Sequence, residues 1–405
     1  MNETTGSIPK NKSSRIISLD VLRGAVIIIM ALDHIRDFFS RSEFNVTDLA
    51  QTTVGLFLTR VMTHYCAPIF IFLAGTSAFL YKIRGRSDSQ LAKFLFTRGI
   101  FLVILELTVV RLGLTFNVNY FLPNSNVCQV IWAIGWSMIA LSLIIRLPLR
   151  AIIVLGAVMI VGHNLFDGVD PTRLGYFEGL WTILHVPGVI KMFPGMNFKI
   201  LYPLVPWIGV MALGYTFGNF MLLEEGKRRK IFFWIGTCLI LIFIALRASN
   251  FYGDALRWSA QKNHLFSLLS FLNVTKYPPS LLYLLMTLGP AILILSFLSE
   301  KENPVTRFLV VFGRVPLFFY VAHLFVIHAI AIVFAFVRYG QIPLWLFKNN
   351  PFYTTPQFPD APSGYGYSLP VVYLVWVGIV MMLFPLCRWY VNFKKTHKSP
   401  ILSYI

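Results

Sequence analysis

Two side chains able to bind an anion and to move a proton share one face of the apolar segment 15–39. Arg23 and His34 are eleven positions apart in the run RIISLDVLRGAVIIIMALDHIRDFF. In an α-helix this spacing points both side chains the same way and separates them by roughly 16 Å along the axis. A neutral imidazole suits general-base work near neutral pH, and a guanidinium binds phosphate groups. Because ionisable groups inside a bilayer are costly, the pair indicates a substrate or proton path.

The next apolar segment, 55–81, carries a second arginine and a second histidine. Arg60 and His64 are at positions i and i+4 and share one helix face. The first segment runs outward and the second returns, so His64 is expected at a depth comparable with His34. We therefore expect the two imidazoles to meet in one polar pocket in the outer half of the membrane, where either can serve as the base. Pro68 should loosen the helix near His64.

Three carboxylates are the expected companions of these groups. Asp33 and Asp37 are close enough in sequence to His34 to orient its ring, Asp33 as a catalytic candidate and Asp37 in support. Glu106, near the middle of segment 95–113, needs a partner inside the bilayer, and an arginine on the first or second segment is the obvious one. The alternative role of Glu106 is an ion pair that fixes the helix bundle.

A later apolar segment adds an aromatic hydroxyl and another imidazole. Tyr320 and His323 are at positions i and i+3, and we expect their shared face to look into the same cavity and orient the reacting groups. His328 points elsewhere on that helix. Together with His163 and His185, it is expected to be a packing residue hydrogen-bonded to a backbone carbonyl.

No metal centre is expected from the sequence. The apolar segments offer no paired ligands of the HxxxH or ExxxH type. The four cysteines, Cys66, Cys128, Cys238 and Cys387, are widely spaced and follow no disulfide or zinc pattern. The sequence also has no Gly-rich phosphate loop and no GxSxG nucleophile motif.

The elements that position these residues are membrane-spanning helices. The 405 residues are 57% hydrophobic and 13% charged, and the mean hydropathy of +0.69 lies far outside the range of soluble domains. The formal net charge of +18 comes mainly from short loops between apolar segments. This is the pattern of the positive-inside rule, so nucleic acid is not an expected partner. We predict an all-α polytopic transmembrane helix bundle surrounded by membrane lipids.

About ten apolar segments are long enough to cross the roughly 30 Å hydrocarbon core. They are 20–39, 55–81, 95–113, 127–145, 150–166, 200–222, 231–247, 280–299, 313–337 and 369–387. Every second loop is short and basic, which predicts that both termini lie in the cytoplasm. The expected division is a cytoplasmic N-terminal segment 1–19, a transmembrane domain 20–387 and a basic cytoplasmic tail 388–405.

The remaining loops are long and rich in aromatic residues, glycine and proline. Loops 167–199, 248–279 and 338–368 are expected to form an outer cap with short interfacial helices. The first eighteen residues are polar and basic, so no cleavable signal peptide is expected. No internal repeat is visible.

The first two segments resemble a known family. SLDVLRGAVIIIMALDH, followed by THYCAPIFIFLAGTSA, is similar to the bacterial relatives of heparan-alpha-glucosaminide N-acetyltransferase, within the wider transmembrane acyltransferase superfamily. The later runs VIWAIGWSMI, YPLVPWIGVMALGYTFG, KYPPSLLYLLMTLGP and FGRVPLFFYVAHL resemble the same group. The recurring superfamily motif is a basic residue, ten intervening residues and a histidine, which Arg23 and His34 match.

The resemblance implies an acyltransferase in the inner membrane of a bacterium. Such proteins take an acyl group, commonly acetyl from acetyl-CoA or another acyl-CoA at the cytosolic face, and deliver it to a sugar or glycan acceptor across the membrane. His34 carries over as the motif histidine and Arg23 as the motif arginine. The animal lysosomal enzymes place Asn where this chain has His34 and use a histidine in the following loop. Since no histidine lies between His34 and His64 here, the identity of the base stays open between these two.

The residues fit acyl transfer on chemical grounds too. A thioester reaction needs a base for the acceptor and donors for the oxyanion, but no metal and no serine nucleophile. Arg23 and Arg60 are candidates for binding the phosphates of CoA, although Arg23 could instead anchor the helix start at lipid headgroups. The alternatives are a transporter or flippase, which buried ionisable residues would also suit, and a structural membrane protein. The acceptor, the acyl chain and any homo-oligomer are left open.

Overall fold

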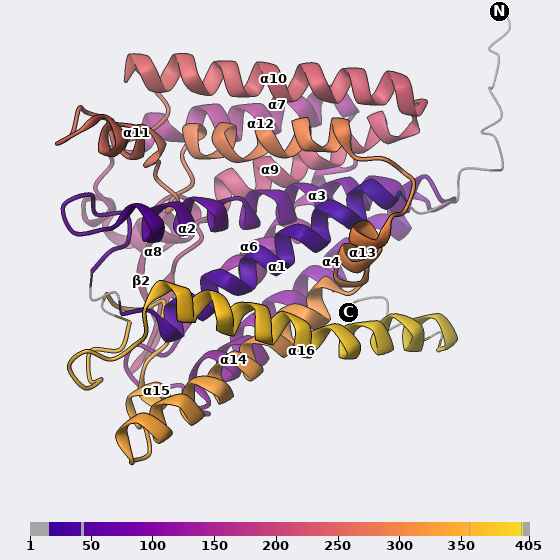
Figure 1. The fold of residues 1–405 in the computed structure, drawn as a ribbon. Helices are drawn as coiled ribbons and strands as arrows, with labels where there is room; N and C mark the ends of the chain where they lie inside the picture. Colours follow the sequence, from indigo (N-terminus) through magenta and orange to yellow (C-terminus); the bar gives the residue numbers. More distant parts are fainter. Residues whose placement is uncertain (1–15, 42–43, 356, 398, 400–405) are drawn as a thin grey trace, which may run out of the picture.

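The computed structural model describes residues 16–41, 44–355, 357–397 and 399. Most of the expected N-terminal segment 1–19, and the end of the tail 388–405, lie outside the described residues. The described chain is mainly helical (Figure 1). It confirms the expectation of an all-α membrane bundle, with one small sheet added.

Each predicted apolar segment is helical over most of its length. The corresponding helices are α1 (Ile17–Phe39), α2 (Val54–His64) with α3 (Cys66–Lys82), α4 (Asp88–Leu105) with η1 (Glu106–Val110) and α5 (Arg111–Thr115), α6 (Val130–Ile144), α7 (Leu149–Gly162) with η2 (His163–Phe166), α9 (Leu204–Phe217) with η4 (Gly218–Leu222), α10 (Glu225–Ser249), α12 (Leu281–Phe297), α14 (Pro316–Tyr339) and α16 (Leu369–Thr396). A further helix, α13 (Pro304–Arg314), precedes α14.

Six of the described helical runs are long and apolar enough to cross a membrane by themselves. Two others, α6 and α12, are apolar but shorter. The 23-residue helix α1 has sufficient length, but it contains five charged side chains, Asp20, Arg23, Asp33, Arg36 and Asp37. The count of ten spans and the cytoplasmic position of both termini stay predictions.

The charged helix α1 lies at the centre of the bundle, and most of its residues are buried. It can be central because glycines let neighbouring backbones approach. A Cβ on Gly24 would overlap the Leu309 carbonyl oxygen of α13, and one on Gly313 would overlap the Asp20 carbonyl oxygen. Helices α3 and α9 approach in the same way through Gly75 and Gly214. Small residues at these two positions therefore allow the helix backbones to pack closely.

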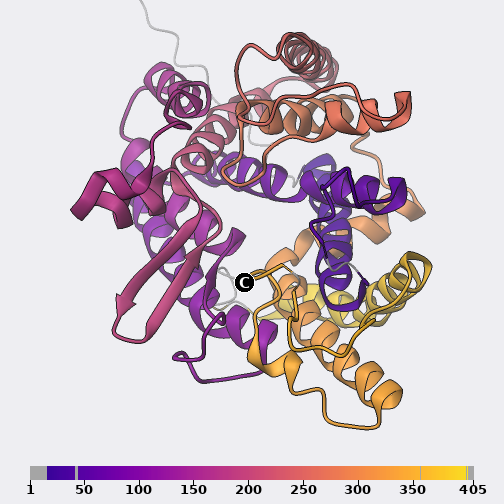
Figure 2. The ribbon, with the colours of Figure 1, turned by 90° about the vertical axis from the view of Figure 1, so that its left-hand side faces the viewer.

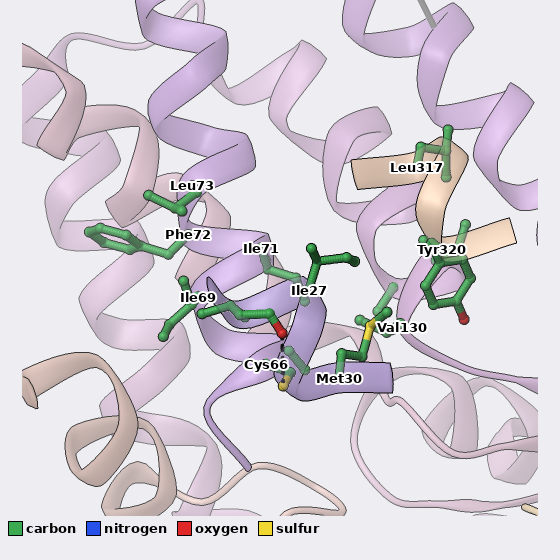
Figure 3. Close-up of a cluster of buried hydrophobic side chains, with 14 of the residues drawn as sticks. Ile27, Met30, Cys66, Ile69, Ile71, Phe72, Leu73, Val130, Leu317 and Tyr320 are labelled. Atoms are coloured by element: carbon green, nitrogen blue, oxygen red, sulfur yellow. Dashed lines mark hydrogen bonds between the residues drawn. The ribbon is translucent and has the colours of Figure 1, made fainter. Parts of the chain in front are cut away.

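A cluster of apolar side chains joins α1 to three of its neighbours (Figure 3). Ile27 and Met30 of α1 lie across from Leu317 and Tyr320 of α14, with Val130 of α6 behind them. On the α3 side, Cys66 Sγ donates to the Val26 carbonyl oxygen at 3.5 Å. This cluster fixes the spacing between the helices that carry the candidate residues.

The long loops gather at one end of the bundle, opposite the end where the described chain begins (Figure 1). They contain the short helices α8 (Glu178–Leu184), α11 (His264–Leu272) and α15 (Trp345–Lys348) and the 3-10 helix η3 (Pro171–Phe177), as expected for a cap.

Loop 167–199 differs from the expectation in one respect, because it also forms a hairpin of β2 (Gly188–Phe193) and β3 (Met196–Ile200). Figure 2 shows this hairpin from the loop end of the bundle. Strand β1 (Val127–Cys128) pairs in parallel with β3 and gives the order β1-β3-β2. The turn is possible because Gly195 adopts φ +76°.

Candidate active site

A basic, elongated cavity of about 590 Å³ opens beside the first half of α1. Along α1 and the residue before it, the lining runs from Ile16 through Arg23 to Met30 and spans roughly 20 Å. Five cationic side chains line it: Arg23, Arg84, Arg98, Arg314 and Lys394. Asp20 is the one acidic residue among the described lining residues, and the deep part near Met30 and Tyr320 is apolar. We call this space the inner cavity.

A second cavity, of about 400 Å³, lies beside the outer loops. Its lining includes Arg36, Asp37, Arg60, His64, Lys199, Lys276, Tyr277 and Phe352. Burial lowers the pKa of Lys199, and the nearby Tyr277 partly offsets this effect. Burial alone would raise the pKa of Tyr277, but Lys276 and Arg60 outweigh it and the pKa lies below its usual value. This outer cavity therefore presents positive charge and aromatic surface together.

His34 lies between the two cavities. Its ring centroid is 6.0 Å from that of Tyr320, which lines the inner cavity, and 5.3 Å from that of Phe352, which lines the outer cavity. The imidazole is 5% exposed, and Nδ1 has no hydrogen-bond partner in the described part of the chain. One titratable ring therefore touches the walls of both spaces.

Tyr320 and His323 both contact His34, but only Tyr320 is among the described lining residues of the inner cavity. The His323 ring lies 5.1 Å from that of His34, centroid to centroid, and 5.5 Å from that of Tyr320. His323 Nδ1 is 3.0 Å from the Phe319 carbonyl oxygen, which favours the tautomer with the proton on Nδ1. The Tyr320 hydroxyl and His323 Nε2 are buried without partners among the described residues.

Asp33 is held by cations instead of by the imidazole. Its carboxylate is 2.8 Å from Arg60 Nη1, 2.9 Å from Arg36 Nη2 and 3.9 Å from Lys276 Nζ, and it accepts a hydrogen bond from Thr63. Asp33 makes no hydrogen bond to His34 in the described structure. Asp33 can therefore act on the His34 ring through electrostatic attraction, and not through the hydrogen bond that would orient the ring.

Asp37 belongs to the same network, since its carboxylate is 2.6 Å from Arg36 Nη2. Its link to His34 is therefore also indirect, through the charges of the network.

His64 lines the outer cavity but does not share a ring contact with His34. Its ring lies 5.5 Å from that of Tyr283, and its Nδ1 is unpartnered within the described residues. Helix α2 ends at His64, as expected from Pro68, which lacks the N–H that would bond the His64 carbonyl. Tyr283 Oη donates to this carbonyl oxygen at 2.7 Å instead. The expected direct meeting of His34 and His64 is therefore not found.

The two arginines proposed as phosphate ligands lie in different places. Arg23 lines the inner cavity, where it donates to Asp20, to the Gly313 carbonyl oxygen and to Ser77 Oγ at 3.0–3.3 Å. Arg60 lines the outer cavity and is paired with Asp33. Arg23 and Arg60 cannot bind one set of phosphates, because the ion pair with Asp33 holds Arg60 at the outer cavity, on the other side of His34.

Glu106 meets a helix N-terminus and not the expected arginine. Its Oε1 accepts from the backbone N–H of Gln129, the residue before α6, at 3.3 Å. Its Oε2 is buried without a hydrogen-bond partner in the described structure. Glu106 begins the π-helical turn η1, a distortion that often marks functional sites. The partial positive charge of a helix start explains how this carboxylate is accommodated without a cation.

The sequence analysis does not predict four of the five cations of the inner cavity, namely Arg84, Arg98, Arg314 and Lys394. Lys276 and Phe352 lie in long loops, and nothing in their local pattern distinguishes them. Only the contact of each loop with α1 and α2 identifies these residues.

A comparison with family models matches more than half of the chain to one family. The model described as heparan-alpha-glucosaminide N-acetyltransferase, catalytic, covers residues 15–246, more than half of the chain. A search of curated proteins finds no match. The matched region contains Arg23, His34, Arg60 and His64, whereas Tyr320 lies beyond it.

Proposed function

The chain belongs to the family of the catalytic domain of heparan-alpha-glucosaminide N-acetyltransferase, and on that premise we propose that it moves an acetyl group from acetyl-CoA in the cytosol to a sugar or glycan acceptor across the membrane. The family is one of membrane acetyltransferases. The observation that carries the proposal is the contact of His34 with walls of both cavities. A location in the inner membrane of a bacterium is part of the proposal.

The inner cavity suits acetyl-CoA by charge and by shape. Its five cations match the phosphates of the CoA head, since arginine binds phosphate through several parallel hydrogen bonds. Its lining spans roughly 20 Å along α1 and is apolar at the deep end, which suits the extended pantetheine arm. A thioester at the deep end would lie beside Tyr320, which contacts His34.

The outer cavity suits a sugar acceptor. Phe352 and Tyr277 offer faces for the apolar side of a sugar ring, and the surrounding polar groups offer hydrogen bonds. Arg36, Arg60 and Lys276 bring three positive charges against the two carboxylates of Asp33 and Asp37, so the network keeps a net positive charge. An acceptor amine or hydroxyl beside Phe352 would be close to His34.

The reaction follows from these placements. The His34 imidazole removes the proton from the acceptor nucleophile as it attacks the thioester carbonyl. The Tyr320 hydroxyl donates to the oxyanion of the tetrahedral intermediate. Collapse breaks the carbon–sulfur bond, and the proton on His34 passes to the CoA sulfur. The product is the acetylated acceptor and free CoA, with His34 neutral again. His64, on the outer cavity, is the rival base.

The test uses purified protein in proteoliposomes with radiolabelled acetyl-CoA on one side and a hexosamine on the other. We expect label to leave CoA and to appear on the acceptor in the opposite compartment. The variant His34→Ala should not release CoA above background, whereas the exposed His264→Ala should behave as the wild type. If the acceptor crosses the membrane without being acetylated, the protein is a transporter and the proposal is wrong.

A further inference from the structure

Two histidines and an aspartate meet near the outer loops, away from both cavities. His163 begins η2, Asp167 follows it, and His185 follows α8. One ligand atom from each residue lies within 4.8 Å of the others, and Asp167 Oδ1 is 3.7 Å from His185 Nε2. The two imidazole centroids are 5.7 Å apart. None of the three residues lines the inner or the outer cavity.

The polar atoms of this cluster are buried without partners. His163 and His185 are each 3% exposed. Both ring nitrogens of His163, Nε2 of His185 and Oδ1 of Asp167 have no hydrogen-bond partner in the described part of the chain. An unsatisfied buried polar atom costs about 1–3 kcal/mol, so several such atoms aimed at one point need a common ligand. The backbone carbonyl groups of Pro279 and Phe166 interact with the His163 and His185 rings, as expected for packing residues, and His185 Nε2 remains available to a ligand.

The surroundings hold the cluster in place. Asn164 Nδ2 donates to Asp167 Oδ2 at 2.8 Å, and Asn164 Oδ1 accepts from the backbone N–H of Leu281 on α12 at 2.9 Å. This leaves Asp167 Oδ1 facing the histidines. The Trp181 ring lies 4.8 Å from that of His185 and adds an apolar wall. Metal ligands are usually held in this way, by hydrogen bonds to the ligating carboxylate and by hydrophobic groups around the site.

We propose that His163, Asp167 and His185 bind one Zn²⁺ ion. Two imidazole nitrogens and a carboxylate oxygen suit zinc and related first-row divalent ions, whereas Mg²⁺ and Ca²⁺ take oxygen ligands. Tetrahedral bonds of about 2.0–2.1 Å separate ligand atoms by about 3.3 Å, so a small closure of the side chains completes the site. Three protein ligands leave the fourth position to water.

The ion would hold the outer cap against the bundle. His163 and Asp167 are continuous with α7, whereas His185 lies beyond η3 and α8. Few residues of this intervening segment are buried, since η3 has no buried residue and α8 has only Thr182. A metal bond across it would tie the start of the β2–β3 hairpin to the end of α7. This tethering of the cap is independent of the proposed acyl transfer.

The HxxxH and ExxxH spacings do not detect this site. His163 and Asp167 are a ligand pair at i and i+4 of the type HxxxD, which is weak on its own. The third ligand comes from a separate segment, and only the fold brings it near.

The test measures bound metal in the purified full-length chain. The protein is stripped with a chelator, equilibrated with zinc and freed of excess metal, and its zinc content is measured by mass spectrometry. We expect about one zinc ion per chain. His185→Ala and the isosteric Asp167→Asn should lose this zinc, and the exposed control His264→Ala should retain it.

A second measurement protects the test against misfolded variants. Replacing zinc by Co²⁺ in the wild type should give the visible absorption of a cobalt ion bound by nitrogen and oxygen ligands, and added zinc should remove it. A chelator should lower the unfolding temperature of the wild type and zinc should restore it. A wild type that takes up neither ion, or an Asp167→Asn, His185→Ala double variant with unchanged zinc, would overturn the proposal.

Discussion

The His323 imidazole lies 5.1 Å from that of His34, centroid to centroid, and its Nδ1 is fixed by the Phe319 carbonyl oxygen. The two rings come from α14 and α1, segments far apart in the sequence. With the proton on Nδ1, His323 Nε2 is left as an acceptor beside His34. The lone pair on His323 Nε2 can therefore stabilise a proton on His34 while the acceptor reacts.

His34→Ala is expected to remove most of the turnover. Loss of a general base commonly costs about 10²–10⁴ in rate. Binding of acetyl-CoA should change little, because the cations that line the inner cavity are untouched. The measurement is labelled acetyl transfer beside equilibrium binding of acetyl-CoA in detergent. The matched control is His264→Ala.

The rival assignment gives the opposite result. If His64→Ala abolishes turnover while His34→Ala leaves it near normal, His64 is the base. If both variants are folded and active, neither His34 nor His64 is the general base of the acetyl transfer.

Arg84→Ala is expected to weaken acetyl-CoA binding about fivefold, which is about 1 kcal/mol for a charge contact at an exposed site. Arg84 lies at the exposed part of the inner cavity, so its removal should not disturb the fold. The dissociation constant is measured at low and high salt, and the difference from wild type should shrink as salt rises. Arg150→Ala, exposed and outside the cavity, is the control. Equal affinities for both variants would argue against CoA in this cavity.

Asp33→Asn is expected to destabilise the protein by about 3–5 kcal/mol. The change leaves Arg36, Arg60 and Lys276 buried around a neutral amide. Thermal unfolding in detergent measures the effect. Asp360→Asn is the matched control, because its pair with Lys348 is more than half exposed and should contribute less than about 1 kcal/mol. Equal unfolding temperatures for the two variants would contradict a stabilising role of the network.

The sequence predicts the helices of this protein better than it predicts the contacts of its charged residues. Apolar length and loop charge locate every long helix, because a bilayer imposes both. The same reasoning predicts Asp33 as a partner of His34 and an arginine as the partner of Glu106, because it rests on sequence spacing and on pairing of opposite charges. In the fold, Asp33 meets Lys276 from a distant loop and Glu106 meets the start of α6.

The split between Arg23 and Arg60 has the same origin. Both are arginines near histidines on adjacent segments, and the pattern gives no reason to separate them. The separation arises because Asp20 and Ser77 hold Arg23 beside the inner cavity, whereas Asp33 holds Arg60 beside the outer one. Helix periodicity gives the face of a residue but not the depth or the partner that it meets.

The predicted topology is tested by reporter fusions in two loops. A reporter at residues 224–230, where α10 begins, is expected in the cytoplasm, because this stretch carries four consecutive basic residues. A reporter in loop 338–368 is expected outside. Reporters on the same side in both fusions would overturn the proposed direction of acetyl transfer, because the inner cavity would no longer face the cytosolic acetyl-CoA.

Gly24→Ala is expected to destabilise the bundle and to impair activity with it. The added methyl group would overlap the Leu309 carbonyl oxygen, which is backbone of α13 and cannot move aside alone. Overpacking of this kind costs about 1–3 kcal/mol. Since Asp20 and Arg23 lie within one turn of Gly24, displacement of α1 from α13 should also weaken acetyl-CoA binding.

The control is Gly378→Ala in α16, where an added Cβ meets no atom within 4 Å. Alanine is the better helix former, so this variant should be at least as stable as the wild type. The two alanine variants differ only in what surrounds the new methyl group. A Gly24→Ala protein that unfolds at the wild-type temperature would mean that α1 and α13 are farther apart in the membrane than in this structure. The basic inner cavity, which both helices line, would then have a different shape.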